Sequence, residues 1–439
     1  MIRMIKKAAF YTLGCKVNQY ETEAVIDIFI DNGYQVVDFS EKADVYIVNS
    51  CTVTNEAARK TRQMARRAKR SSPDSIVAIV GCYTQAFPDE VSEIEEIDFI
   101  MGSNSKAEIL KKAEKMLAGK SPENNVKKYS QLKEYEHLEL KRLSNTTRAN
   151  VKIEDGCNQF CSYCIIPYAR GPVRSRREED VIAEIRRLSQ QGVKEIILTG
   201  THLGAYGSDK GNSKALTQLM QRLTELEELK RVRLSSIEGT EIDQGIINLI
   251  AEEEIFCPHL HLPLQSGSDQ ILEAMNRPYT VKEFKDTAAE LKKRIPDLAV
   301  TTDVIVGFPG ETEATFAETL EVVEEIGFSK VHVFPYSARE GTPAAEMDQI
   351  NGSIIKDYSK KLRLLNKSLM LSYQKEFLGK EKEVLVEEVR DHKTDLLTGY
   401  TDNYLKVLFE GSDDLKNKLV KVKLKESLDA YHLKGKIIN

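Results

Sequence analysis

Short apolar segments of strand type alternate with helical patterns over most of this chain of 439 residues. In the first part, the strand-type segments are KAAFYTL, DVYIVNS, SIVAIVG and IDFIMG, which are rich in Val, Ile and aromatic residues. A helical pattern, ETEAVIDIFIDNG, ends at Gly33. Continuous apolar strands separated by helices predict a parallel sheet that is covered on both faces. Residues 1–140 are therefore expected to form a parallel α/β domain.

Residues 141–375 show the same alternation and form a second expected domain. Its strand-type segments are ANVKIED, KEIILTG, RVRLSSI, PHLHLPL, AVTTDVIVG and KVHVFPYS. Six βα units rather than eight predict an open, partial parallel barrel, whose site lies at the carboxyl ends of the strands. Ser175 and Glu178 have the spacing of a capping box at the start of one helix.

Residues 376–439 differ in character from the rest of the chain. Short β-type runs are separated there by Gly, Asp and Asn, which predicts a small antiparallel β-barrel. Its aromatic residues Tyr400, Tyr404 and Phe409 suit RNA contact and core packing equally well.

Basic residues are concentrated in two segments, although the net charge of the chain is −5. Residues 59–70 hold seven basic residues and no acidic one, and residues 416–436 hold seven lysines. A single basic helix face is commonly only solvated, but two separate basic segments favour a polyanionic partner such as RNA. Arg62, Arg66 and Arg67 are the candidate RNA-binding residues of the first segment.

The chain shows no segment typical of a signal peptide or of a membrane span. We therefore expect a cytoplasmic protein without a membrane partner, in which clustered cysteines are metal ligands or catalytic groups. Cys15, Cys51 and Cys82 each follow a strand-type segment of the first domain. Because parallel strands end at one edge, these cysteines are expected to share a site, with three unrelated buried thiols as the alternative.

Three further cysteines, Cys157, Cys161 and Cys164, form the pattern C-x3-C-x2-C after the first strand of the second domain. This pattern is too compact for an ordinary tetrahedral zinc site, which uses two separated pairs. Three thiolates around an iron–sulfur cube leave one iron without a protein ligand, and that iron can bind a substrate or cofactor. A zinc loop and an electron-transfer cluster are the alternatives.

The stretch DGCNQFCSYCIIPYARG resembles the cluster loop of radical S-adenosylmethionine (SAM) enzymes, with Tyr163 just before the last cysteine. The resemblance implies that the open iron of a [4Fe-4S] cluster is chelated by SAM, and that an electron from the cluster cleaves SAM to a deoxyadenosyl radical. It also implies cofactor contacts from three later strand ends. These contacts are Gly200, Thr201 and His202 at the methionine moiety, Ser236 and Glu238 at the ribose or the amine, and Val306 and Gly307 at the adenine.

The arrangement of the whole chain resembles the methylthiotransferases, which combine a domain with three spread cysteines, a radical SAM core and a small barrel called TRAM. The resemblance implies a second [4Fe-4S] cluster on Cys15, Cys51 and Cys82, two molecules of SAM, and no catalytic residue beyond the cluster ligands. One SAM donates a methyl group to sulfur carried on the second cluster, and the other yields the radical that removes hydrogen from the substrate. A reducing electron donor such as flavodoxin or ferredoxin is an expected partner.

Two segments point to the substrate. LGCKVNQYETEA and NSCTVTNEAARK resemble the branch of the family that acts on threonylcarbamoyl-adenosine beside the anticodon of tRNA. The basic segment 59–70 follows Cys51 and is expected to place RNA phosphates near the second cluster. The branches that modify isopentenyl-adenosine in tRNA or a ribosomal protein stay open, as does an iron–sulfur RNA-binding protein without radical chemistry.

The seventh cysteine, Cys257, precedes a strand-type segment and is expected to be a buried thiol. His259 and His261 follow it, and we expect them to face opposite sides of that strand.

Overall fold

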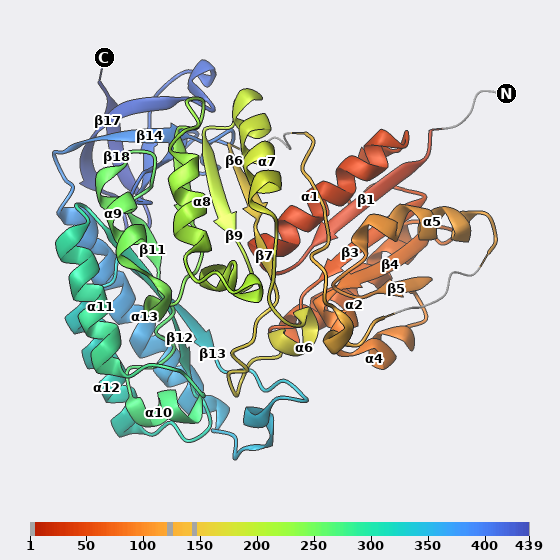
Figure 1. Cartoon of the computed structure of the whole chain (residues 1–439), viewed down its shortest axis with the longest axis horizontal. Helices are drawn as coiled ribbons and strands as arrows, with labels where there is room; N and C mark the ends of the chain where they lie inside the picture. The colour runs from red at the N-terminus through yellow and green to blue at the C-terminus, as the bar shows by residue number, and fades with distance from the viewer. Residues whose placement is uncertain (1–4, 121–125, 143–146, 439) are drawn as a thin grey trace.

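The computed structural model describes residues 5–120, 126–142 and 147–438. A parallel five-stranded sheet in the order β2-β1-β3-β4-β5 forms the N-terminal layer (Figure 1). Its strands are β1 (Lys7–Thr12), β2 (Gln35–Val37), β3 (Val45–Ser50), β4 (Ile76–Gly81) and β5 (Phe99–Met101). The four predicted strands are present, and β2 is an addition that the sequence pattern did not indicate.

Helices cover both faces of this sheet, as the continuous apolar strands require. On one face α1 and α5 pack against Val45, Ile47 and Ala78, and on the other face α2, α3 and α4 pack against Tyr46, Val48 and Ile79. The helices are α1 (Lys16–Asp31), α2 (Asn55–Ser71), α3 (Cys82–Ala86), α4 (Pro88–Ser92) and α5 (Ile109–Leu117).

The central part is a six-stranded partial barrel of parallel strands, as predicted. Two three-stranded sheets, β6-β9-β10 and β11-β12-β13, are joined by isolated bridges between Val232 and Phe256 and between Ser236 and His261. The strands are β6 (Arg148–Lys152), β9 (Glu195–Thr199), β10 (Arg231–Leu234), β11 (His259–His261), β12 (Ala299–Val306) and β13 (Lys330–Pro335).

Helices form the outer wall of the barrel and share one hydrophobic core with its strands. They are α7 (Glu178–Gln190), α8 (Ala215–Leu223), α9 (Gln244–Glu252), α10 (Asp269–Ala274), α11 (Val281–Arg294), α12 (Glu313–Ile326) and α13 (Gly352–Lys375). The predicted capping box on α7 is wrong. The hydroxyl of Ser175 binds Asp209 instead, and Arg177 precedes the helix without a side-chain cap.

Helix α1 belongs to two cores. Val25 and Phe29 pack in the core of the N-terminal sheet, whereas Tyr20 and Ala24 pack in the core of the barrel. The helix lies along β6, at one edge of the partial barrel. The N-terminal layer and the barrel are therefore joined by packed apolar surface and not only by the connecting chain.

The C-terminal part is a closed five-stranded barrel in the order β14-β15-β16-β18-β17. Its strands are β14 (Glu381–Val386), β15 (Leu397–Thr401), β16 (Lys406–Phe409), β17 (Leu419–Ser427) and β18 (Leu433–Ile437). Four of its pairings are antiparallel, as predicted, but β16 and β18 run parallel. Phe409 is 1% exposed in its core, so it is a packing residue and offers no face for RNA contact.

No helix among the described residues is both long enough and apolar enough to span a membrane. The exact domain boundaries at residues 140 and 375 stay predictions.

Candidate active site between two groups of cysteines

Cys15, Cys51 and Cys82 lie at the carboxyl ends of β1, β3 and β4, which are neighbours in the sheet. Packing at this rim is close, because a Cβ atom added to Gly14, whose φ is +104°, would lie 3.0 Å from Sγ of Cys51. Burial and the neighbouring Cys82 thiol raise the pKa of Cys51 to about 12. The structure thus brings the three cysteines to one rim, and their role as ligands stays a prediction.

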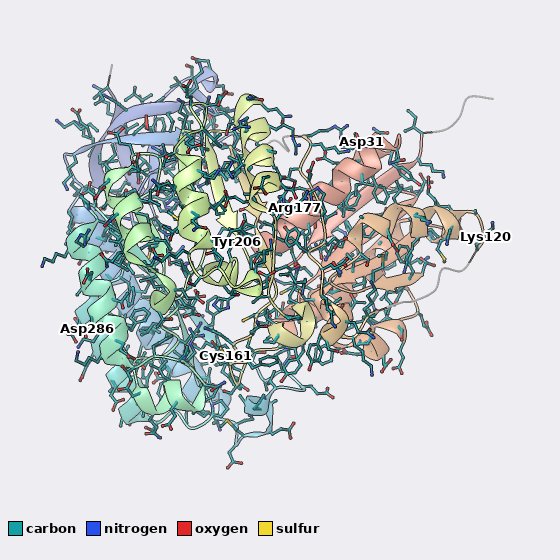
Figure 2. The ribbon with its side chains drawn as sticks, viewed as in Figure 1. Asp31, Lys120, Cys161, Arg177, Tyr206 and Asp286 are labelled. Carbon is teal, nitrogen blue, oxygen red and sulfur yellow. The ribbon has the colours of Figure 1, made fainter. Side chains whose placement is uncertain are left out.

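The second group of cysteines lies on the loop between β7 (Glu154–Asp155) and α6 (Ile166–Arg170). Two side chains from other parts of the barrel direct N–H groups at its sulfurs. Arg277 donates to Sγ of Cys161 over 3.2 Å, and Nδ1 of His202 lies 3.6 Å from Sγ of Cys157. Cationic donors favour the thiolate over the thiol. The thiolate is the form of cysteine that binds metals. Figure 2 shows Cys161 between the barrel and the N-terminal layer.

Arg170 connects the two groups of cysteines. It follows the second group on α6 and is 1% exposed, yet its Nε donates over 3.1 Å to Sγ of Cys82 in the first group. Its Nη1 also donates to Glu21 on α1 over 2.6 Å and lies 3.3 Å from Asp155. The two groups of cysteines therefore lie on either side of one buried guanidinium group.

This guanidinium is part of a larger network of buried charges between the N-terminal layer and the barrel. Although burial opposes ionisation, Arg170, Lys106 and Lys152 hold the pKa of Glu21 at about 2. Every member is almost completely shielded from solvent. The members are Glu21, Lys106, Lys152, Asp155, Arg170 and Arg174. No local sequence pattern marks this network, because its pairs to Glu21 join residues more than 80 positions apart in the chain.

The residues expected at the methionine end of SAM surround the second group of cysteines. Gly200 packs so tightly that an added Cβ atom would lie 2.6 Å from Oε2 of Glu154. The Thr201 hydroxyl donates to Asp155 over 3.1 Å. Glu238 is 8% exposed and pairs with Arg277, the residue that also reaches Cys161. These side chains form one hydrogen-bonded shell around the cysteine loop, and contact with a cofactor is still a prediction.

The residues expected at the adenine lie next to Tyr163. The ring of Tyr163 packs edge-on against Phe308 with centroids 6.5 Å apart, and Phe308 directly follows Gly307. Val306, which precedes the glycine, is completely buried. The backbone N–H of Gly307, whose φ is +78°, donates over 2.5 Å to Glu311, which the sequence analysis did not single out. Glu311 fixes the turn that follows β12.

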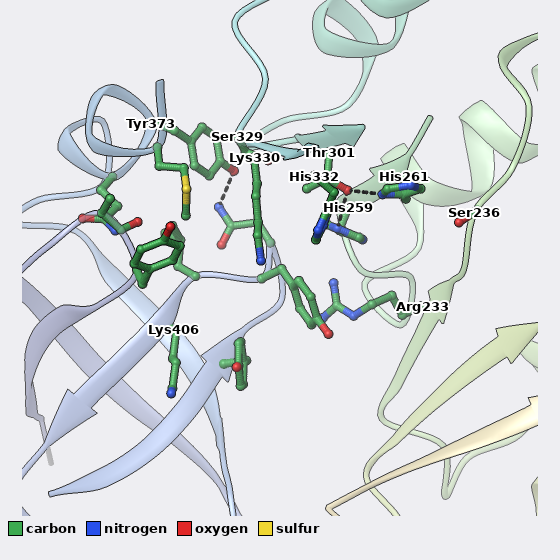
Figure 3. A pocket seen from close by; sticks show the side chains of 18 of the residues that line it. Arg233, Ser236, His259, His261, Thr301, Ser329, Lys330, His332, Tyr373 and Lys406 are labelled. Carbon is green, nitrogen blue, oxygen red and sulfur yellow. Dashed lines mark hydrogen bonds between the residues drawn. The ribbon is translucent and has the colours of Figure 1, made fainter. Parts of the chain in front are cut away.

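A cavity of about 600 Å³ lies where α1, the central barrel and the C-terminal barrel meet (Figure 3). Ser236, one of the predicted cofactor residues, is part of its lining. His259 and His261 line it too, and both bind the Thr301 hydroxyl, over 3.3 and 2.9 Å. The expectation that they face opposite sides is wrong, because residues two apart on a strand lie on the same face. Cys257 is 3% exposed, as expected for a buried thiol.

The three predicted RNA-binding arginines lie at different distances from the rim that holds Cys51. Helix α2 starts beside this rim and runs back along the sheet, so that Lys69 near its end donates to the carbonyl of Ser75 before β4. Arg66 and Arg67 therefore lie toward the opposite edge of the sheet, whereas Arg62 donates to the hydroxyl of Tyr83, the residue after Cys82. The expected placement of RNA phosphates near the second cluster stays a prediction.

Two of these arginines already have protein partners. Arg62 lies 3.1 Å from Glu90, and Arg66 lies 3.4 Å from Glu96. Arg67 is exposed. Their contact with RNA stays a prediction.

Comparison with known families identifies the class of the central part. The model described as "Radical SAM superfamily" matches residues 151–323, "Uncharacterized protein family UPF0004" matches residues 7–102, and "TRAM domain" matches residues 375–438. A solved structure of the radical S-adenosylmethionine methyltransferase TsrM from Kitasatospora setae has a similar fold. Its TM-score is 0.59 at 16% identity, over 78% of this chain and 77% of TsrM. The fold and the cysteine loop are those of a radical SAM enzyme.

Curated relatives define the family more narrowly. The threonylcarbamoyladenosine tRNA methylthiotransferase MtaB of Bacillus subtilis is 43% identical over 95% of this chain and 93% of its own length. MtaB of Aquifex aeolicus is 39% identical over 95% and 99%. A tRNA-2-methylthio-N(6)-dimethylallyladenosine synthase of Moorella thermoacetica is 35% identical over the full length of both chains. The chain belongs to the radical SAM methylthiotransferase family.

Membership of the radical SAM superfamily implies a [4Fe-4S] cluster and SAM. In the parts of the chain that the structure describes, no three His, Cys, Asp or Glu side chains gather closely enough to hold a single metal ion. In a four-iron cluster the thiolates bind different iron atoms, so cluster cysteines need not converge on one point. Three cysteines on one loop, with Arg277 and His202 directed at their sulfurs, fit such a cluster by donor type and charge.

Proposed function

We propose that this protein transfers a methylthio group to C2 of threonylcarbamoyl-adenosine beside the anticodon of tRNA. The observation that supports this most strongly is the 43% identity, over 95% of the chain, to a relative named for that activity. The two groups of cysteines support it as well, since Arg170 lies between them. Sulfur transfer and radical formation need two separate sites that face one substrate.

We further propose that Cys157, Cys161 and Cys164 hold the cluster that binds SAM, and that Cys15, Cys51 and Cys82 hold a second [4Fe-4S] cluster. When bound, the first cluster and SAM supply a radical that removes hydrogen from a C–H bond without useful acidity. Arg277 donates to Sγ of Cys161, and Nδ1 of His202 lies 3.6 Å from Sγ of Cys157, so both side chains orient the loop that would hold this cluster.

The proposed cofactor contacts have distinct tasks. Gly200 and Thr201 shape the loop at the methionine, Ser236 and Glu238 bind its amine or the ribose, and Tyr163, Val306 and Gly307 enclose the adenine.

The proposed partners are tRNA and a reducing electron donor such as flavodoxin or ferredoxin, in the cytoplasm. Residues 1–140 carry the second cluster, residues 141–375 the radical chemistry, and residues 376–439 the main RNA contact.

The test is mass analysis of nucleosides in tRNA from cells that lack the protein. The methylthio derivative of threonylcarbamoyl-adenosine should disappear, and its precursor should accumulate. Wild-type protein and the Cys257→Ala variant should restore it, because Cys257 lies outside both groups, whereas Cys157→Ala should not. Loss of the methylthio group from isopentenyl-adenosine instead would assign the protein to the activity for which the Moorella relative is named. Unchanged tRNA together with an unmodified ribosomal protein would assign it to the protein-modifying branch.

A further inference from the structure

The cavity shown in Figure 3 is lined by residues from three parts of the chain. Lys16, the residue after Cys15, lines it from α1, and Ser236 lines it from the end of β10. Tyr404 and Lys406 close it from the C-terminal barrel. A molecule in this cavity therefore lies against α1, the radical SAM core and the C-terminal barrel at once.

Cationic side chains outnumber carboxylates in the cavity wall. Among the described residues, Asp303 is the one carboxylate that lines it, and Asp303 lies 3.2 Å from Nε2 of His261. The cationic residues of the wall are Lys16, Arg233, Lys330 and Lys406. Arg233 is neutralised by Glu195 at 2.9 Å. The cavity therefore keeps a surplus of positive charge that comes from its lysines.

The three lysines of the wall form no ion pair with any carboxylate in the described parts of the chain. Each is only partly exposed, and burial lowers the pKa of Lys330. In Figure 3 the side chain of Lys330 extends into the middle of the cavity. A partly buried ammonium group without a counter-charge costs free energy, which an anionic ligand would offset.

Aromatic rings form the neighbouring wall. Tyr400 and Tyr404 lie 5.1 Å apart between centroids, with ring planes inclined by 31°. Guanidinium groups cover them, with Arg148 4.6 Å from the Tyr400 centroid and Arg233 4.3 Å from that of Tyr404. Single-stranded bases stack on aromatic rings and on guanidinium planes, so this wall suits an unstacked nucleotide.

We propose that this cavity receives an oxyanion of the RNA substrate, next to the reacting adenosine, and that Lys16 and Lys330 are its cationic contacts. This inference rests on the proposed function. The RNA offers two such groups, the carboxylate of threonylcarbamoyl-adenosine and a backbone phosphate. If the carboxylate is the ligand, the cavity also determines specificity, because an isopentenyl group carries no charge.

The test uses the full-length, anaerobically reconstituted protein and three anticodon stem-loop RNAs. The RNAs carry threonylcarbamoyl-adenosine, its carboxamide analogue, or isopentenyl-adenosine. Affinity is measured by fluorescence anisotropy at several salt concentrations, and methylthio product by mass spectrometry. The variants are Lys330→Met and Lys16→Met, and the matched control is Lys293→Met, an exposed lysine of α11 outside the cavity. Thermal unfolding shows which variants are folded.

If the ligand is the carboxylate, the wild type binds the threonylcarbamoyl RNA about tenfold more tightly than the carboxamide RNA, and Lys330→Met abolishes this preference. If the ligand is a phosphate, Lys330→Met weakens the binding of all three RNAs equally. It also lowers the slope of log affinity against log salt by about one. The inference is overturned if folded Lys330→Met and Lys16→Met variants bind every RNA as the wild type does. Failure of the proposed function gives a different result, namely wild-type protein that makes no methylthio product from the threonylcarbamoyl RNA.

Discussion

The guanidinium group of Arg170 donates to Sγ of Cys82 and forms ion pairs with the carboxylates of Glu21 and Asp155. Arg170→Met removes this group and leaves two buried carboxylates with fewer counter-charges. We expect a loss of about 3 to 5 kcal/mol in the free energy of unfolding, which is typical of breaking a buried ion pair. Urea unfolding followed by circular dichroism measures the loss.

The matched control for this prediction is Arg177→Met. Arg177, labelled in Figure 2, pairs with Asp180 at the surface, and its own side chain is 75% exposed. Exposed pairs contribute at most about 1 kcal/mol, so this variant should unfold almost like the wild type. Equal urea midpoints for the two variants would show that the buried network is not a stabilising contact.

Glu311 makes stability depend on pH. Burial raises the pKa of this carboxyl from its ordinary value of 4.5 to about 7, although the N–H of Gly307 opposes the shift. The folded state binds this proton more tightly than the unfolded state. The contribution of the Glu311 carboxyl to the free energy of unfolding is therefore fully present below pH 4.5 and is lost as the pH rises through 7.

The permanently neutral variant Glu311→Gln should therefore match the wild type near pH 5 and exceed its stability by roughly 2 to 3 kcal/mol at pH 8. Urea unfolding at both pH values checks this. The exposed Glu321→Gln should show no such difference. A stability difference between Glu311→Gln and the wild type that stays constant with pH would contradict the shifted pKa.

Two strands of the C-terminal barrel present lysines on one face. On β17, Lys421, Lys423 and Lys425 alternate with the buried Val422 and Leu424. Lys423 stands directly opposite Lys436 of β18 in the ladder. Like charges in opposite positions destabilise a sheet, although Glu381 of β14 stands opposite Lys423 on its other side. The lysines of this face suit an external polyanion as a partner.

The double variant Lys423→Gln, Lys436→Gln should weaken tRNA binding and lower the slope of log affinity against log salt by about two, because two fewer counterions are released. Anisotropy measurements between low and physiological salt give this slope. Lys282→Gln with Lys361→Gln, on α11 and α13, removes the same charge from exposed helix positions and should leave the slope unchanged. An identical slope in both double variants would exclude the lysine face as the RNA contact.

Elements with a strong local pattern were predictable, and contacts between distant segments were not. The ten strands expected in the first two parts exist, because apolar β-branched runs favour buried strands wherever they pack. The three-residue β2 is too short for such a signal. Ser175 and Glu178 had the spacing of a capping box, but the Ser175 hydroxyl binds Asp209, and this tertiary contact overrides the local pattern.

The candidate site shows the same division. Cys157, Cys161 and Cys164 stand close together in the sequence, so their common location followed from spacing alone. The rim of Cys15, Cys51 and Cys82 followed from a rule about parallel strands. Arg170 and Arg277 were missed, since each acts on a sulfur that only the folded chain brings near. Glu311 lies only four residues after Gly307, but no spacing rule marks a carboxylate that accepts from the N–H of this turn. The distance of Arg66 and Arg67 from the rim of Cys51 follows from the direction of α2, which the basic segment alone does not reveal.

At the scale of the whole molecule, the two groups of cysteines stand on separate scaffolds. We expect about eight irons per chain after anaerobic reconstitution, four at each site. Replacement of Cys157, Cys161 and Cys164 by Ala should leave about four, because β1, β3 and β4 do not depend on that loop. Iron analysis and protein quantification give the ratio, with Cys257→Ala as the control that keeps all eight. A triple variant that binds no iron, or all of it, contradicts two independent sites.

Helix α1 begins directly after Cys15 and packs in two cores, and this has an evolutionary consequence. A segment shared by two cores cannot be inherited with only one of them. The Tyr20 hydroxyl lies 3.1 Å from Glu184 on α7, so a lineage that alters one of these residues must adjust the other. Recombination that exchanges the first 140 residues between distant homologues should therefore yield poorly folded chimeras unless the surface that receives α1 is exchanged with them.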